Sequence, residues 1–135
     1  EETALALSLG KNRLPELLTP ERISTYRVPD SIIVLSGCDS QQAKAIPGLG
    51  LVGISRAWLT AGASAVIVSS WPTADDGGKF FASFYRHLAA PSLASSSPGK
   101  RAAVALALTQ LEMQHSNGYR KSPSFWAAYN VVSKE

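Results

Sequence analysis

The sequence has few of the residues that build disulfides and metal sites, with one cysteine and two histidines among its 135 residues. A single cysteine excludes an internal disulfide and fits a reducing compartment. No spacing of Cys, His, Asp or Glu matches a metal site. We therefore expect neither a metal nor another cofactor.

Long apolar runs and basic clusters are also missing. No stretch reaches the roughly 18 to 20 apolar residues that a membrane span requires, and no signal-peptide pattern is present at the start. The net charge is +3, but the 13 basic residues are scattered and not interleaved with aromatics, so the pattern of a nucleic-acid binder is weak. We expect a cytoplasmic protein that binds neither membrane nor nucleic acid.

What is present is typical of a globular α/β domain, with 45% hydrophobic and 17% charged residues. Apolar runs bounded by turn residues predict strands, and apolar residues at helical spacing predict helices between them. This alternation favours a largely parallel sheet covered on both faces. The predicted strands are residues 4–9, 32–35, 63–70 and 125–132.

Capping residues mark several of the predicted helices. Thr19 and Pro20 fit the start of a short helix, and Gly62 fits the end of a helix over about residues 51–61. Two longer helices follow, one after Asp75 or Asp76 and one over about residues 100–115. Their predicted buried faces are Phe80, Phe81, Phe84, Tyr85 and Leu88 for the first, and Val104, Ala107, Leu108 and Leu111 for the second.

Cys38 follows the predicted strand 32–35 by a few residues. In open α/β sheets, chemistry collects beyond the carboxyl ends of the strands, which is where a working thiol would lie. The alternative is a small buried residue that ends the strand, since free cysteine is often buried. Asp75 and Asp76 follow the carboxyl end of the next strand, on the same side of the sheet as Cys38. They either cap the helix that follows or bind a basic group of a substrate. Trp71 is either a core residue or a wall beside that site.

Residues 48–53 spell G-x-G-x-x-G, the pattern of a dinucleotide-binding turn. That turn must follow its strand directly, whereas a long loop separates residues 48–53 from the strand before them. The next strand ends on Ser69 and Ser70, where an acidic residue would hold the ribose. Nucleotide binding therefore stays an alternative, and the glycines are better explained by loop geometry.

Two histidines could activate the thiol, but neither follows a strand. His87 lies within the helix that starts near Asp76, and His115 lies at a helix end, where a cation is favoured by the dipole. Surface and capping roles explain both.

Several blocks of the sequence, arriving in order, resemble the CHAT domain. This domain is a caspase-like module often found with TPR repeats in bacteria and related to separase. The resemblance covers nearly the whole chain from about residue 5 and is carried by residues 34–40, 50–63, 66–76, 84–88, 105–110 and 124–129.

The resemblance implies a caspase-like three-layer sandwich and a bacterial cysteine endopeptidase in which Cys38 is the nucleophile. Backbone amides near Gly37 and Cys38 would hold the oxyanion. The family's histidine base precedes the strand matched here by residues 4–9, so the chain resembles the C-terminal two thirds of one CHAT domain. We expect that histidine upstream or on another chain, and little peptidase activity from residues 1–135 alone.

The resemblance also implies how a protein or peptide substrate binds. In separase-like relatives an acidic residue accepts a basic P1 side chain, and the matching position is Asp75, with Asp76 next to it. Ser69, Ser70 and Trp71 would pair with the substrate backbone by strand addition. TPR repeats are the implied partner. The alternatives are a non-catalytic interaction module and a nucleotide-binding domain.

Overall fold

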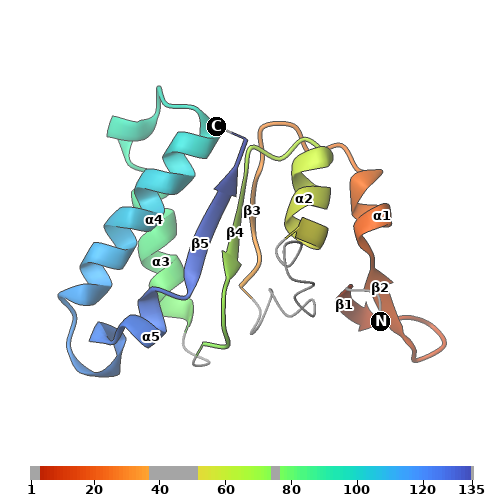
Figure 1. The fold of residues 1–135 in the computed structure, drawn as a ribbon, viewed down its shortest axis with the longest axis horizontal. Coiled ribbons are helices and arrows are strands. Elements are labelled where there is room, and N and C mark those ends of the chain that lie inside the picture. The colour runs from red at the N-terminus through yellow and green to blue at the C-terminus, as the bar shows by residue number, and fades with distance from the viewer. Residues whose placement is uncertain (1–3, 37–51, 74–76, 135) are drawn as a thin grey trace.

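The computed structural model describes residues 4–36, 52–73 and 77–134. Two small sheets and their helices follow one another along the chain (Figure 1). The first half contains β1 (Leu5–Leu9), β2 (Pro15–Leu18), α1 (Pro20–Ser24), β3 (Ile32–Val34), α2 (Val52–Thr60) and β4 (Ala65–Ser69). The second half contains α3 (Gly77–Leu88), η1 (Pro91–Leu93), α4 (Pro98–Gln114), η2 (Gly118–Lys121), α5 (Pro123–Trp126) and β5 (Tyr129–Ser133).

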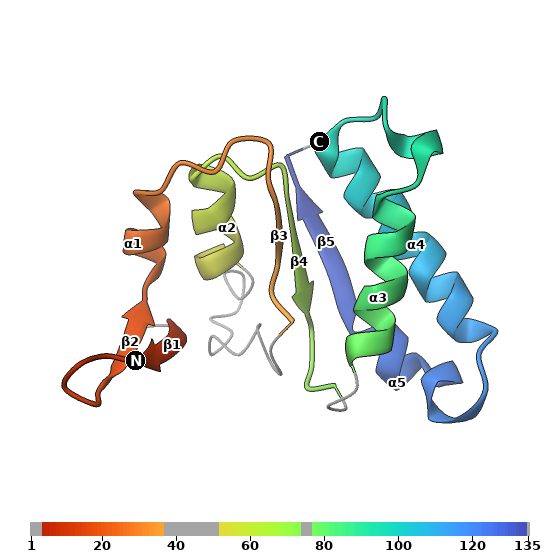
Figure 2. The same ribbon diagram turned by 180° about the vertical axis from the view of Figure 1, so that it is seen from behind.

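The larger sheet has the order β3-β4-β5 and lies between two layers of helices. Figures 1 and 2 show α3 and α4 on one side of this sheet and α1 and α2 on the other. Strand β4 is in the middle, and each of its five residues is at most 1% exposed. The prediction of an α/β fold with a sheet covered on both faces is confirmed.

The direction of the last strand differs from the prediction. β3 runs parallel to β4, whereas β5 runs antiparallel to it, so the sheet is mixed and not largely parallel. The reason is that two helices, not one, connect β4 to β5. α3 leads away from the carboxyl end of β4 and α4 leads back to it (Figure 1), so the next strand must run in the opposite direction. The predicted strand 125–132 begins as the short helix α5.

An aromatic cluster fills the core between the sheet and α3. Tyr129 of β5 is 1% exposed, and its ring centroid lies 4.4 Å from that of Phe80 and 5.0 Å from that of Phe81. Phe84 and Phe125 complete the cluster. The predicted inner face of α3 is confirmed except for Tyr85, which is 51% exposed.

The predicted buried face of α4 is wrong. Leu106 and Met113 are buried beside smaller side chains, while Leu108 and Leu111 are 39% and 50% exposed. Ala102 and Ala105 are fully buried, because only small side chains allow the helix backbone to come close to its neighbours. Thr109, also fully buried, satisfies its hydroxyl by donating to the Ala105 carbonyl at 2.8 Å.

A β-hairpin of β1 and β2 forms the second sheet, and β2 was not predicted. It is held through Leu5 and Leu18, which pack against Ile23 of α1 and Ile54 of α2. The predicted N-cap of α1 is confirmed, since the Thr19 hydroxyl accepts from the Arg22 amide at 3.4 Å.

Gly62 ends α2 as the sequence predicts. Its φ is +113°, and the amides of Gly62 and Ala63 donate to the carbonyls of Leu59 and Trp58, both at 3.1 Å. This is the Schellman arrangement, which places glycine in a left-handed conformation just after the helix. A Cβ at this position would also lie 3.4 Å from the backbone of Pro29.

We predict that Gly62→Ala destabilises the protein by about 1–2 kcal/mol, because alanine strains at positive φ. Gly78→Ala is the matched control, since Gly78 lies in α3 with no positive φ, and a Cβ added there would meet no other atom within 4 Å. That change should be neutral or stabilise by up to about 1 kcal/mol. Urea denaturation measures both, and equal effects of the two changes would contradict this account.

Candidate functional site

The parallel pair β3 and β4 defines the candidate site, because both strands end at the same edge of the sheet (Figure 1). Ile32, Ile33 and Val34 align with Ala65, Val66 and Ile67, and the Leu35 amide extends the ladder by donating to the Ile67 carbonyl at 2.9 Å. Gly37 and Cys38 follow Ser36 in the sequence but lie outside the described residues.

Ser69, Ser70 and Trp71 lie at the carboxyl end of β4, as predicted, but in different environments. Ser69 is fully buried. The Ser70 amide donates to the carbonyl of Ala128, the residue before β5, at 2.7 Å and is therefore already paired. Trp71 is 39% exposed, and its indole Nε1 donates to the Ser124 carbonyl at 2.8 Å. Trp71 is thus the one of the three that presents a large side chain to solvent.

Residues of β5 hold this segment from the other side, and the sequence did not point to them. The Asn130 amide donates to the Ser70 hydroxyl and, at 3.2 Å, to the Ala128 carbonyl. The Tyr129 hydroxyl lies 3.1 Å from the Thr73 hydroxyl. The only signal in the sequence is a polar Asn within an apolar strand. Asp75 and Asp76 follow Thr73 closely but lie outside the described residues.

The two histidines lie on α3 and at the end of α4. His87 Nε2 lies 3.1 Å from Glu112 Oε2, and His115 is the C-cap residue of α4, with its Nδ1 2.7 Å from the Leu111 carbonyl. The predicted capping role of His115 is confirmed. The side chain of His87 is only 25% exposed and contacts Glu112 of the neighbouring helix, so it has neither a surface nor a capping role.

Glu112 is the centre of a polar cluster between α3 and α4. Its Oε2 accepts from the Ser83 hydroxyl at 2.6 Å and from Arg86 Nη2 at 2.6 Å, and Arg86 also donates to Ser83 at 3.2 Å. These hydrogen bonds, the one from Ser83 first and that from Arg86 second, lower the pKa of Glu112 to about 2. The carboxylate is therefore ionised at neutral pH.

Other kinds of site find little support in the described part of the chain. Across residues 4–36, 52–73 and 77–134 there is no group of three His, Cys, Asp or Glu side chains that could hold a metal ion. In the same residues no helix is long and apolar enough to cross a membrane. The motif at 48–53 lies largely outside the described residues, and its last two positions fall in the first turn of α2.

Taken together, the chain is an α/β domain whose only cysteine follows the carboxyl end of a strand beside β4. A sequence model of the CHAT domain matches residues 1–134, so the chain belongs to the CHAT domain family. This confirms the resemblance seen in the sequence.

Two curated relatives are similar over most of the chain. Tetratricopeptide repeat protein 28 of Homo sapiens is 28% identical over 120 residues, and that of Mus musculus is 32% identical over 121 residues. Each alignment covers 88% of this chain and 4% of the relative. The chain thus spans a small part of the length of these relatives, and the predicted bacterial origin stays a prediction.

We predict that Glu112→Gln lowers stability by about 1 kcal/mol or less at pH 7, because the Glu112 side chain is 43% exposed and solvent screens its ion pair. The pKa of Glu112 is lowered in the folded state, so its contribution is present above about 4.5 and is lost as pH falls toward about 2. The variant should therefore lose less stability than the parent over that pH range.

Urea denaturation at several pH values measures this difference. Glu16→Gln is the matched control, since Glu16 forms an exposed ion pair with Arg22 at 3.1 Å without a comparable cluster. If Glu16→Gln reduced the loss of stability at acid pH as much as Glu112→Gln does, a specific role for Glu112 would be contradicted.

Proposed function

We propose that this chain is the thiol-bearing part of a caspase-like cysteine endopeptidase, with Cys38 as nucleophile. The observation that carries the proposal is the parallel ladder of β3 and β4, which continues to Leu35, three positions before Cys38 in the sequence. The chain after Leu35 and the segment Ser70–Trp71 therefore leave the sheet at the same end, beyond the carboxyl ends of β3 and β4. Membership of the CHAT family supports the same role.

The proposed fold of the complete domain is a caspase-like three-layer sandwich. Two features support it, namely the helices on both faces of the β3-β4-β5 sheet and the family match over residues 1–134 (Figure 2).

A cysteine peptidase needs a base that generates the thiolate. His87 and His115 are each engaged within the α3 and α4 layer. We therefore propose that the base for Cys38 is a histidine outside this chain, preceding it in the same polypeptide or on a partner. With the base in place, the thiolate attacks the scissile carbonyl, and backbone amides near Gly37 and Cys38 bind the oxyanion.

The name of the curated relatives supports TPR repeats as the structural partner in this proposal. A nucleophilic thiol must stay reduced, which favours a cytoplasmic location. A protein or peptide is the proposed substrate.

The test is alkylation of Cys38 by an iodoacetamide probe across pH, on this chain and on the longer polypeptide that contains it. Because Cys38 is the only cysteine in the chain, peptide mapping of the labelled position reports on it alone. We expect the thiolate in the longer polypeptide to titrate well below the usual value of about 8.5, and that of the isolated chain to titrate higher.

Cys38→Ser is the control for background labelling. An unreactive thiol, or one that titrates normally in the longer polypeptide, would contradict the peptidase proposal and favour a non-catalytic interaction module. Thermal stabilisation by a dinucleotide would instead favour the nucleotide-binding alternative.

We further propose that Asp75 accepts a basic P1 side chain. In the complete enzyme, Asp75→Asn should lower kcat/KM for an arginine P1 peptide by about tenfold or more, because a charge-assisted hydrogen bond is lost. Asp76→Asn is the matched control and should have a smaller effect. Equal cleavage of arginine and leucine P1 peptides by the parent enzyme would exclude the proposal.

A further inference from the structure

The side chain of Tyr129 joins the aromatic core to the segment that follows β4. Tyr129 is the first residue of β5 and is 1% exposed. Its ring centroid lies 4.4 Å from that of Phe80 and 5.0 Å from that of Phe81, near the start of α3. Its hydroxyl lies 3.1 Å from the hydroxyl of Thr73. One side chain therefore contacts both the segment that leaves β4 and the start of α3.

These contacts flank Asp75 in the sequence, which is the proposed site for a basic P1 side chain. Thr73 is the last described residue before Asp75, and Gly77, the first residue of α3, is the first described residue after it. A carboxylate that recognises one substrate side chain must be supported by residues that packing and hydrogen bonds hold in place. Tyr129 meets this requirement on both flanks.

The aromatic core does not require the hydroxyl of Tyr129. A phenylalanine ring would fill the same space, and a hydroxyl that is buried without a partner costs free energy. Thr73 supplies the partner. Residues 71–73 belong to no helix or strand, so side-chain contacts of this kind matter for their position. The hydroxyl is thus better explained by the segment that it contacts than by the core that surrounds the ring.

We propose that Tyr129 is a positioning residue for substrate recognition, with its hydroxyl holding Thr73 and thereby the chain that leads to Asp75. Because Tyr129 is buried, it acts through Thr73 and not by touching the substrate. The inference rests on the proposed function, since it assigns a support to the proposed P1 site.

The first test is hydrogen exchange of the complete protein, measured by mass spectrometry of peptides that cover residues 70–73. Tyr129→Phe removes the hydroxyl and keeps the ring, and we expect these amides to exchange about two- to tenfold faster, as for the loss of one hydrogen bond. Gly62→Ala is the control for overall stability, because it destabilises the fold at the end of α2 and leaves Tyr129 in place. It should leave exchange in residues 70–73 unchanged. Equal acceleration in both variants, or none in Tyr129→Phe, would overturn the proposal.

The second test is peptide cleavage by the complete enzyme. Tyr129→Phe should raise KM for an arginine P1 peptide about two- to tenfold and leave kcat nearly unchanged, because the support of a binding group is lost. A simple loss of folded enzyme would lower kcat and leave KM as it is. Tyr85→Phe is the matched control and should change neither constant, since Tyr85 of α3 is 51% exposed.

A fall in kcat at constant KM, or the same change in both tyrosine variants, would overturn the positioning role. If the complete protein cleaves no peptide at all, the proposed function fails. Hydrogen exchange needs no substrate, so it still decides whether the hydroxyl of Tyr129 holds residues 70–73.

Discussion

Strand β4 has no face exposed to water, and this constraint organises the rest of the domain. Because all five of its residues are buried, both faces need helices and both edges need strands. α3 and α4 cover one face, α2 covers the other, and β3 and β5 pair along the edges (Figure 1). The segment that follows β4 therefore starts from a fixed position, which is what a binding site requires.

The paired helices α3 and α4 determine where β5 begins, and β5 in turn holds the segment that follows β4. They return the chain to the carboxyl end of β4, so β5 begins beside Ser70. Asn130 and Tyr129 then bond to Ser70 and Thr73, and Trp71 bonds to Ser124. Gln110 of α4 fastens the start of β5 by donating to the Tyr129 carbonyl at 3.0 Å. An antiparallel last strand is thus what holds the segment that follows β4 in place.

Local signals in the sequence were sufficient for most elements, and long-range packing decided the rest. Thr19 and Gly62 act through neighbours in the sequence, so their caps could be predicted. The buried face of α4 could not, because Leu106 and Met113 are buried whereas Leu108 and Leu111 are exposed, and hydrophobicity alone does not distinguish these residues. The direction of β5 depends on the path of two helices, which periodicity does not reveal. Of the candidate site, the sequence indicated Trp71 but not Asn130, whose role depends on pairing across the sheet.

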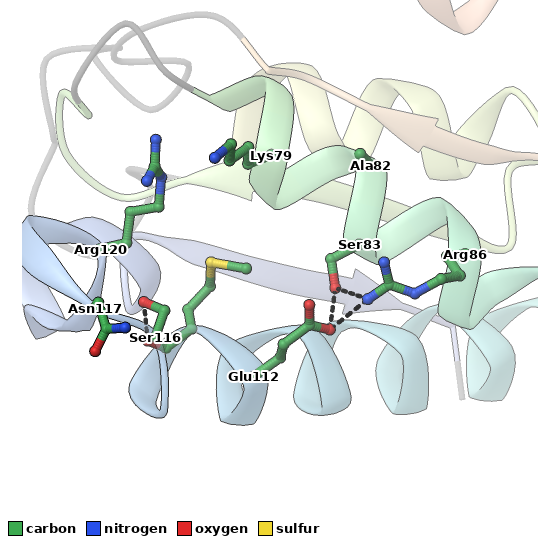
Figure 3. Close-up of a pocket in the computed structure, with 9 residues that line it drawn as sticks. Lys79, Ala82, Ser83, Arg86, Glu112, Ser116, Asn117 and Arg120 are labelled. Atoms are coloured by element: carbon green, nitrogen blue, oxygen red, sulfur yellow. Dashed lines mark hydrogen bonds and ion pairs between the residues drawn. The ribbon is translucent and has the colours of Figure 1, made fainter.

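Helix α3 has an apolar face that packs in the core and a second face that carries charged residues. Phe80 and Phe84 are fully buried in the aromatic core beside Tyr129, which bonds to the segment after β4. Lys79 and Arg86 are exposed, and Arg86 donates to Glu112 of α4 (Figure 3). Since side chains one residue apart on a helix diverge by about 100°, the charge of the exposed face can change without disturbing the face that packs in the core.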